Sequence, residues 1–83
     1  MASDYSVAQE AFLRKVGEKI RSLRIERGLA QEAMAHVIKM DRSYYGRVER
    51  GEKNLSILKI KAIADELGVS AAELLDIEDA GSL

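Results

Sequence analysis

A short stretch, residues 42–50, carries side chains whose chemistry suits contacts with nucleic acid. It contains the guanidinium groups of Arg42, Arg47 and Arg50 and the hydroxyl group of Ser43. A guanidinium group can donate two hydrogen bonds to O6 and N7 of guanine in the major groove, or it can bind a phosphate. The stretch is therefore a candidate DNA-contacting segment, provided that the fold holds it as an exposed element.

The distribution of charge favours the same interpretation, although the net charge of the chain is −1. All 13 Lys and Arg residues lie between Arg14 and Lys61, where only 6 acidic residues accompany them. The flanking segments, residues 1–13 and 62–83, have acidic but no basic side chains. Such segregation is typical of a middle region that faces phosphates, but a helical surface covered by salt bridges explains the charges equally well.

The side chains that most enzymes need are scarce in this sequence. The chain has no cysteine and a single histidine, His36, and it lacks a glycine-rich phosphate loop or a cluster of metal ligands. These absences exclude disulfides and thiolate metal sites, and they predict a protein that is not an enzyme and needs no cofactor or metal. We expect His36 to lie on a helix surface.

The length of 83 residues predicts one domain with a small core, spanning about residues 12–77 between flexible ends. No run of about 18 apolar residues occurs, and the N-terminal residues lack the basic start and apolar stretch of a signal peptide. These features predict a soluble, cytoplasmic protein without membrane contact.

Hydrophobic periodicity predicts an all-α fold. Proline is absent, and apolar residues recur at helical spacing in several segments. The expected helices cover residues 7–27, ended by Gly28, then 31–38 and 42–50, with Asp41 as the N-cap of the third. A fourth helix begins after Ser56 and ends at Gly68, and Ser70 with Glu73 forms a capping box for a fifth.

The second and third predicted helices are short and only about three residues apart, as in a helix-turn-helix. Ala35 stands where the two helices would cross, and a small side chain there lets their backbones approach closely. The inward side chains would be Ile38, Met40, Tyr45 and Val48. The outward face of the third helix would then carry the cationic and small residues Arg42, Ser43, Gly46, Arg47 and Arg50.

Three segments resemble the lambda-repressor-like (Xre/Cro type) helix-turn-helix regulators: VGEKIRSLRIERGLAQEAMA, DRSYYGRVERGEKNLS and LGVSAAELL. The resemblance covers about residues 16–75. It implies a compact five-helix DNA-binding domain with the helix-turn-helix at helices 2 and 3. The combination of DRSYY with ERGEKNLS is most similar to the controller proteins of restriction-modification systems.

The resemblance also implies roles for individual residues. Base contacts are expected from Arg42, Ser43 and Arg47, although for Arg47 a phosphate contact or a solvated salt bridge is an equal alternative. Gln31 is expected to bind a phosphate and to brace the start of the recognition helix. The full set of expected phosphate contacts is Gln31, Tyr44, Arg50, Lys53, Asn54 and Ser56, the last through its helix N-terminal amides.

Two further residues are expected to form a structural ion pair. The family pairs an arginine at the position of Arg24 with a glutamate at the position of Glu49. If this pair is deeply buried, removal of one partner would cost roughly 3–5 kcal/mol. The resemblance therefore excludes both residues from base contacts.

Several positions depart from the family pattern. Lys39 stands where the turn usually has glycine, which would cost about 1 kcal/mol in a left-handed conformation. Ala30 replaces the usual Ser or Thr cap before Gln31, Leu55 replaces a common proline, and Gly46 costs about 1 kcal/mol against alanine within a helix. These departures leave the predicted fold intact.

A single helix-turn-helix offers few base contacts, so a homodimer on a palindromic operator is expected. The predicted dimer interface consists of Leu74, Leu75 and Ile77, although the core of the monomer must take some of these side chains. The controller resemblance adds RNA polymerase as a partner that a bound dimer could recruit. The alternative function is a protein-interaction or antitoxin-like helical module that uses the acidic C-terminal end and does not need Arg42 or Arg47.

Overall fold

The computed structural model describes residues 2–77 of the chain, with side-chain exposure from Ser6 onward, and this part is all-helical. The helices are α1 (Ala2–Glu26), α2 (Gln31–Val37), α3 (Arg42–Glu49), α4 (Ile57–Leu67) and α5 (Ala71–Leu75). The all-α prediction is confirmed. The predicted flexible C-terminal end, after residue 77, lies outside the described residues.

Three predicted helix ends were one residue too long, and the start of the first was five residues too late. The second, third and first helices end at Val37, Glu49 and Glu26, while α1 begins at Ala2. The segment before Val7 contains no Gly or Pro to stop a helix, so the backbone hydrogen bonds of α1 continue into it.

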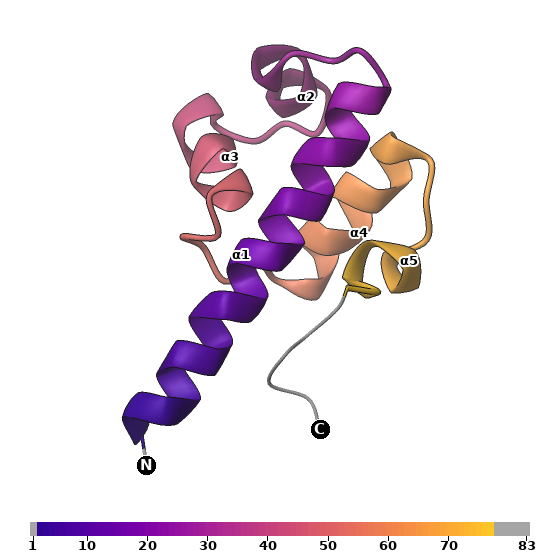
Figure 1. The fold of residues 1–83 in the computed structure, drawn as a ribbon. Coiled ribbons are helices and arrows are strands. Elements are labelled where there is room, and N and C mark those ends of the chain that lie inside the picture. Colours follow the sequence, from indigo (N-terminus) through magenta and orange to yellow (C-terminus); the bar gives the residue numbers. More distant parts are fainter. Residues whose placement is uncertain (1, 78–83) are drawn as a thin grey trace.

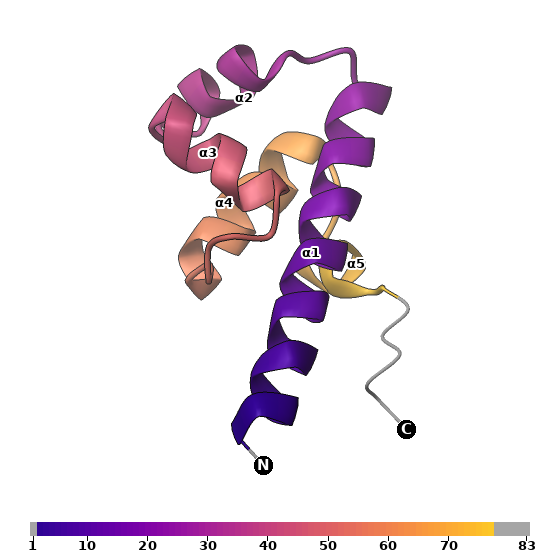
Figure 2. The same ribbon diagram turned by 60° about the vertical axis from the view of Figure 1, so that its left-hand side comes forward.

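The long helix α1 is the element on which most of the other helices pack. It contacts α3, α4 and α5, while α2 packs on α3 and α5 packs on α4. In Figures 1 and 2 the N-terminal half of α1 extends beyond the other helices, and α2 and α3 lie on a different side of α1 from α5. This arrangement exposes one long side of α3.

Each helix contributes a fully buried side chain to a single core. These residues are Ile20 of α1, Met34 of α2, Tyr45 of α3, Ile63 of α4 and Leu74 of α5. The predicted inward residues Ala35 and Val48 are also buried, and Ile38 and Met40 pack against the same core. The inward face of the predicted helix-turn-helix is therefore confirmed.

The predicted helix caps are confirmed by hydrogen bonds. The side chains of Asp41, Ser56 and Ser70 accept from the backbone N–H groups of Tyr44, Lys59 and Glu73 at 3.0, 3.2 and 2.9 Å. The side chain of Ala30 does not cap α2, because a methyl group cannot accept a hydrogen bond. Gly68 ends α4 in the left-handed conformation, with φ of 74°.

The turn between α2 and α3 has the shape that the family's glycine would adopt. Lys39 has a φ of 56°, which is the left-handed region, and the backbone N–H of Met40 donates to the carbonyl oxygen of Ala35 at 2.9 Å. The lysine therefore bears the cost of about 1 kcal/mol relative to glycine, and the turn keeps its shape.

Two glycines set the distance between α1 and the end of α3. A Cβ on Gly17 would lie 2.7 Å from the carbonyl oxygen of Val48, and a Cβ on Gly51 would lie 2.5 Å from the Cα of Arg14. Both contacts are with backbone, which cannot move aside as a side chain can. The absence of a side chain at these two glycines therefore allows α1 to pack closely against the end of α3. This close packing was not predicted from the sequence.

None of the described helices has a segment both long and apolar enough to span a lipid bilayer.

Candidate nucleic-acid interface

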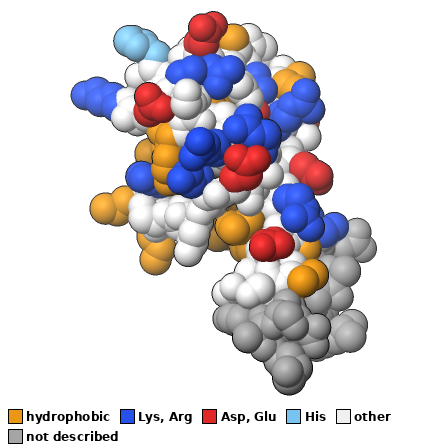
Figure 3. Space-filling view, turned by 90° about the vertical axis from the view of Figure 1, so that its left-hand side faces the viewer, with side chains coloured by type: hydrophobic (Ala, Val, Ile, Leu, Met, Phe, Trp, Pro, Cys, Tyr) orange, Lys and Arg blue, Asp and Glu red, His pale blue; other side chains and the backbone are white. Residues whose placement is uncertain are grey.

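The exposed side of α3 carries the arginines predicted to contact DNA. Arg42, Ser43, Arg47 and Arg50 are exposed, while Tyr45 is fully buried on the opposite side. Figure 3, which views the molecule from the side of α3, shows Lys and Arg side chains gathered across this face, with separate Asp and Glu side chains among them and around them. The structure thus brings the three predicted base-contacting residues together on one accessible surface.

Gly46 corrects one part of that prediction. It was expected on the outer face, but it is buried, because the side chains of Arg42 and Arg50 lie across it. A Cβ at this position would lie 3.0 Å from Nη1 of Arg42 and 3.4 Å from Nη1 of Arg50. The outward surface at the middle of α3 is therefore made by guanidinium groups and not by the glycine backbone.

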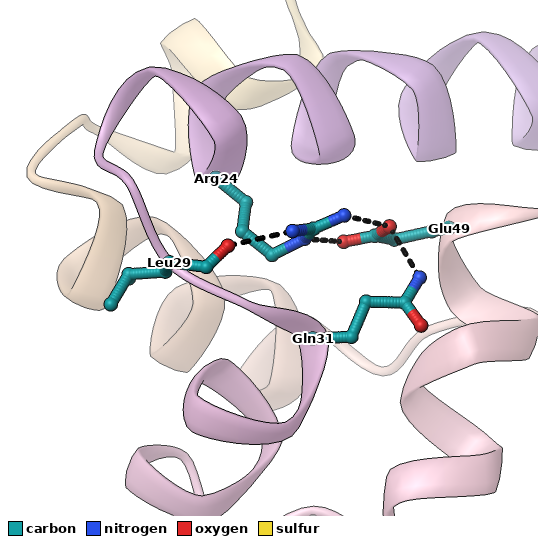
Figure 4. Close-up of polar contacts among 4 residues, drawn as sticks. All are labelled: Arg24, Leu29, Gln31 and Glu49. Carbon is teal, nitrogen blue, oxygen red and sulfur yellow. Dashed lines mark hydrogen bonds and ion pairs between the residues drawn. The ribbon is translucent and has the colours of Figure 1, made fainter.

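A buried ion pair joins α1 to the end of α3, as predicted for Arg24 and Glu49. Nε of Arg24 lies 2.6 Å from Oε2 of Glu49, and Nη2 lies 3.1 Å from Oε1. The third nitrogen, Nη1, donates to the carbonyl oxygen of Leu29 at 2.7 Å. Figure 4 shows this two-pronged contact, with Arg24 reaching both α3 and the loop that leads to α2.

Gln31 completes this cluster from the start of α2. Its Nε2 donates to Oε1 of Glu49 at 2.8 Å (Figure 4). The carboxylate of Glu49, on α3, therefore binds one side chain from α1 and one from α2. Gln31 was predicted to brace the start of the recognition helix, but this bond holds Glu49 at the end of α3. Its phosphate contact stays a prediction.

The cluster changes the proton affinity of its members. Burial alone would raise the pKa of Glu49, but the hydrogen bond from Arg24, with a smaller contribution from the hydrogen bond of Gln31, outweighs it and lowers this pKa below its ordinary value of 4.5. The hydrogen bond to Glu49 raises the pKa of Arg24. Glu49 is therefore ionised and Arg24 is protonated at neutral pH.

The hydroxyl group of Tyr45 lies at the edge of this cluster. It is buried and makes no hydrogen bond with the described residues. Burial, and then the nearby Glu49 carboxylate, raise the pKa of Tyr45. Tyr45 therefore stays neutral and belongs to the core, as predicted.

Beside the arginines, Tyr44 and two lysines form a second group. Nζ of Lys59 lies 3.2 Å from the Tyr44 hydroxyl oxygen and 4.4 Å from the ring centroid, and Nζ of Lys53 lies 5.4 Å from that centroid. Cations over an aromatic ring are attracted by its electron-rich face. The group places ammonium charges next to a phenolic hydroxyl, a combination suited to an anion.

Sequence reasoning missed Lys59. A signal was present, because a cation in the first turn of a helix opposes the helix dipole and so does not serve helix stability. Lys59 is the third residue of α4, and no acidic residue occupies that turn.

Three other predicted phosphate contacts, Arg50, Asn54 and Ser56, lie on the surface. Arg50 pairs with Glu52 at 3.1 Å, with both side chains more than half exposed, at 58% and 51%. Asn54 and Ser56 are exposed in the segment that follows. The pairing of Arg50 is weak enough in water for a phosphate to replace it.

The predicted dimer interface needs a correction at Leu74. Its side chain is fully buried in the core, so it has no surface to offer a partner. Leu75 and Ile77 are half-buried and pack against the same core. Among the large apolar side chains of the described part, the most exposed are instead Ile57 and Leu58 at the start of α4. Their exposed fractions are 82% and 80%.

Comparison with known proteins gives consistent matches. A model of the helix-turn-helix family matches residues 20–74. The control protein C.MunI of a Mycoplasma species is 39% identical over 66 residues, which cover 77% of this chain and 89% of the relative. The matched residues include all of α2, α3 and α4 and the end of α1, so they contain the exposed Arg42 and Arg47 of α3 and the buried cluster of Arg24, Gln31 and Glu49.

Solved structures give the same result. The restriction-modification controller protein C.AhdI from Aeromonas hydrophila is 44% identical with a TM-score of 0.74, over 77% of this chain and 97% of that one. The controller protein C.Esp1396I, solved as a tetramer in complex with its natural 35 base-pair operator, is 36% identical with a TM-score of 0.68, over 77% and 88% of the two chains.

Proposed function

Because this chain belongs to the helix-turn-helix family and is a DNA-binding transcriptional regulator similar to restriction-modification controllers, we propose that it binds a palindromic operator as a homodimer. We further propose that this operator lies upstream of its own gene, within a restriction-modification system.

The exposed side of α3 is the observation that carries this proposal. Arg42, Ser43 and Arg47 face solvent on a helix whose far end is anchored by the buried Arg24 and Glu49. An exposed arginine on a rigid helix can donate a bidentate pair of hydrogen bonds to guanine, worth about 1–3 kcal/mol of discrimination. These three residues are therefore proposed to contact bases.

The surface beside α3 supports binding to the sugar-phosphate backbone. Lys53 and Lys59 flank the ring of Tyr44, and Lys59 is added to the predicted set because of this position. Phosphate contacts fix a protein on DNA without selecting a sequence. The complete proposed set is Gln31, Tyr44, Arg50, Lys53, Asn54, Ser56 and Lys59.

The exposed pair Ile57 and Leu58 supports the homodimer. Adjacent apolar side chains of this size, each at least 80% exposed, lose contact with water if a second copy covers them. They follow directly after the loop that carries Lys53 and Asn54, so a dimer formed there would lie beside residues proposed to contact phosphates. Recognition helices of such dimers enter successive major grooves about 34 Å apart.

A mobility-shift titration tests the DNA-binding part of the proposal. It uses DNA from upstream of the gene and a random duplex, at two salt concentrations, with the wild type, Arg42→Ala and Lys53→Ala. We expect Arg42→Ala to abolish the preference for the upstream DNA, while Lys53→Ala weakens binding to both duplexes and reduces the salt dependence. Equal binding of the wild type to both duplexes would refute autoregulation and favour the interaction module. An Arg42→Ala variant that keeps the wild-type preference would remove Arg42 from the proposed base contacts.

Sedimentation tests the homodimer. We expect Leu58→Asp to convert the protein to monomers, because a charge in an apolar interface is costly to bury, and Leu75→Asp serves as the comparison for the originally predicted surface. A dimer that persists in both variants would place the interface elsewhere.

Methyltransferase and endonuclease genes beside this gene would support the controller assignment, and recruitment of RNA polymerase can then be tested by transcription in vitro.

A further inference from the structure

We propose that Gly46 is a specificity-determining position. In this inference, which rests on the proposed function, the missing side chain at residue 46 lets Arg42 and Arg50 lie across α3 in the arrangement that selects the operator. Gly46 then acts as a positioning residue, through the arginines and without a contact of its own.

The backbone gives no reason for a glycine at residue 46. Glycine in the interior of a helix costs about 1 kcal/mol relative to alanine. The positive-φ glycines of the described chain are Gly28, Gly51 and Gly68, so Gly46 has a conformation that alanine adopts freely. A local argument therefore predicts that alanine would be the better residue here.

The surroundings of Gly46 give a different reason. The atoms nearest to a Cβ built at this position are Nη1 of Arg42 at 3.0 Å, Nη1 of Arg50 at 3.4 Å and Oε1 of Gln31 at 3.9 Å. All three are ends of flexible side chains, and all three residues belong to the proposed DNA-contacting set. The space that a methyl group would fill is therefore occupied by the DNA-contacting groups themselves.

Helix geometry explains why both arginines reach this point. Arg42 and Arg50 are four residues before and four residues after Gly46, so all three lie on the same side of α3. Their two cationic groups meet over the glycine, although like charges repel. A hydrogen-bond acceptor from DNA placed between the two guanidinium groups would relieve that repulsion. Two cations held close together in this way are suited to bind an anionic or acceptor-rich ligand.

The two arginines differ in how firmly they are held. Arg50 donates from Nε and Nη2 to Glu52, while its Nη1 points to Gly46. For Arg42 we find no hydrogen bond or ion pair within residues 2–77, so its guanidinium position depends on the space over Gly46. A methyl group at residue 46 would sit in tight contact with Arg42 and in ordinary contact with Arg50, so it would displace mainly the proposed base-contacting residue.

The experiment compares Gly46→Ala with the wild type in stability and in DNA discrimination. Urea unfolding is expected to show a midpoint equal to or higher than that of the wild type. Fluorescence anisotropy with the operator and a random duplex, at one salt concentration, is expected to show a loss of discrimination of about 5-fold or more, within the range of one bidentate base contact. Affinity for the random duplex should change by less than about twofold, because the phosphate contacts remain.

A double variant gives the second measurement. If Gly46 acts through Arg42, then Gly46→Ala should change discrimination little in a chain that already carries Arg42→Ala. Both single variants should also lose preference at the same base pairs when a library of randomised half-sites is selected.

Gly17→Ala is the matched control, because its methyl group would overlap backbone atoms of α3. It is expected to lower the urea midpoint and to weaken binding to operator and random duplex in parallel. All titrations are made at a temperature at which each variant is folded.

Three results would overturn the inference. The first is wild-type discrimination by Gly46→Ala, the second is full additivity with Arg42→Ala, and the third is a parallel loss of affinity for both duplexes, as in Gly17→Ala. Failure of the proposed function itself would look different, because the wild type would then show no preference for the operator.

Discussion

Two ion pairs involve neighbouring residues at the end of α3, Glu49 and Arg50, and yet they differ sharply in burial. Glu49 binds Arg24 at 2.6 Å with side-chain exposures of only 2% and 9%. Arg50, the next residue, binds Glu52 at 3.1 Å with exposures of 58% and 51%. Both pairs join an arginine to a glutamate, and they differ in burial and in the additional hydrogen bonds of the buried pair, from Gln31 and to Leu29.

Burial determines which ion pair stabilises the fold and which one can open to bind a ligand. The carboxylate of Glu49 joins three helices, and removal of one buried partner would leave an uncompensated charge. The exposed pair is hydrated and screened by salt, so Arg50 can exchange Glu52 for a phosphate at little cost. One turn of backbone thus contains a fixed structural contact followed by an exchangeable one.

The largest expected effect comes from Glu49→Ala. It leaves Arg24 without its carboxylate and Gln31 without its acceptor, so the free energy of unfolding should fall by roughly 3–5 kcal/mol. Urea denaturation measures this value. Glu52→Ala, which breaks the exposed pair, is the control and should cost less than about 1 kcal/mol. Equal costs for the two variants would contradict the comparison.

The next effect is a dependence of stability on pH. The folded-state pKa of Glu49 is lowered below 4.5, so its stabilising contribution is complete above that pH and is lost as the pH falls through the lowered value. In urea titrations from pH 7 to pH 3, the difference in stability between the wild type and Glu49→Gln should therefore shrink below about pH 4.5.

The same titration of Glu52→Gln supplies the reference for this measurement. Its difference from the wild type should stay small at every pH, because the carboxylate is exposed. A gap between the wild type and Glu49→Gln that does not change with pH would argue against an ionised Glu49 in the folded cluster.

Arg50→Ala should separate folding from DNA binding. Its effect on the free energy of unfolding should be under about 1 kcal/mol, because the pair with Glu52 is exposed. The slope of log affinity for DNA against log salt should become shallower by about 1, as expected for the loss of one phosphate contact. An unchanged slope would remove Arg50 from the proposed set of phosphate contacts.

The smallest effect is expected at Lys61 and Asp65. This exposed pair within α4 has a distance of 2.6 Å, shorter than that of Arg50 and Glu52, yet both side chains are about three-fifths exposed, at 62% and 59%. Asp65→Asn should change the free energy of unfolding by no more than about 0.5 kcal/mol. A loss comparable to that of Glu49→Ala would show that distance, and not burial, determines the value of an ion pair in this protein.

The sequence by itself determined the helices and the side of each one that is buried. Helical spacing of apolar residues and the caps Asp41, Ser56 and Ser70 act over one or two turns, so these features follow from nearby residues. The family resemblance added the partnership of Arg24 and Glu49 and the expected roles of the individual residues on the exposed side of α3. The positions of Arg42, Ser43 and Arg47 on one exposed surface follow from helical geometry once Tyr45 and Val48 are known to be inward.

Only the tertiary structure decided how these elements use their neighbours. The burial of Leu74, the position of Lys59 beside Tyr44 and the close packing at Gly17 depend on contacts between residues far apart in the chain. Local patterns cannot give such contacts, because they depend on the angle and distance at which helices pack. Gly46 shows both levels at once: its helix is predicted locally, whereas the arginines that cover it are visible only when the side chains of α3 are placed in space.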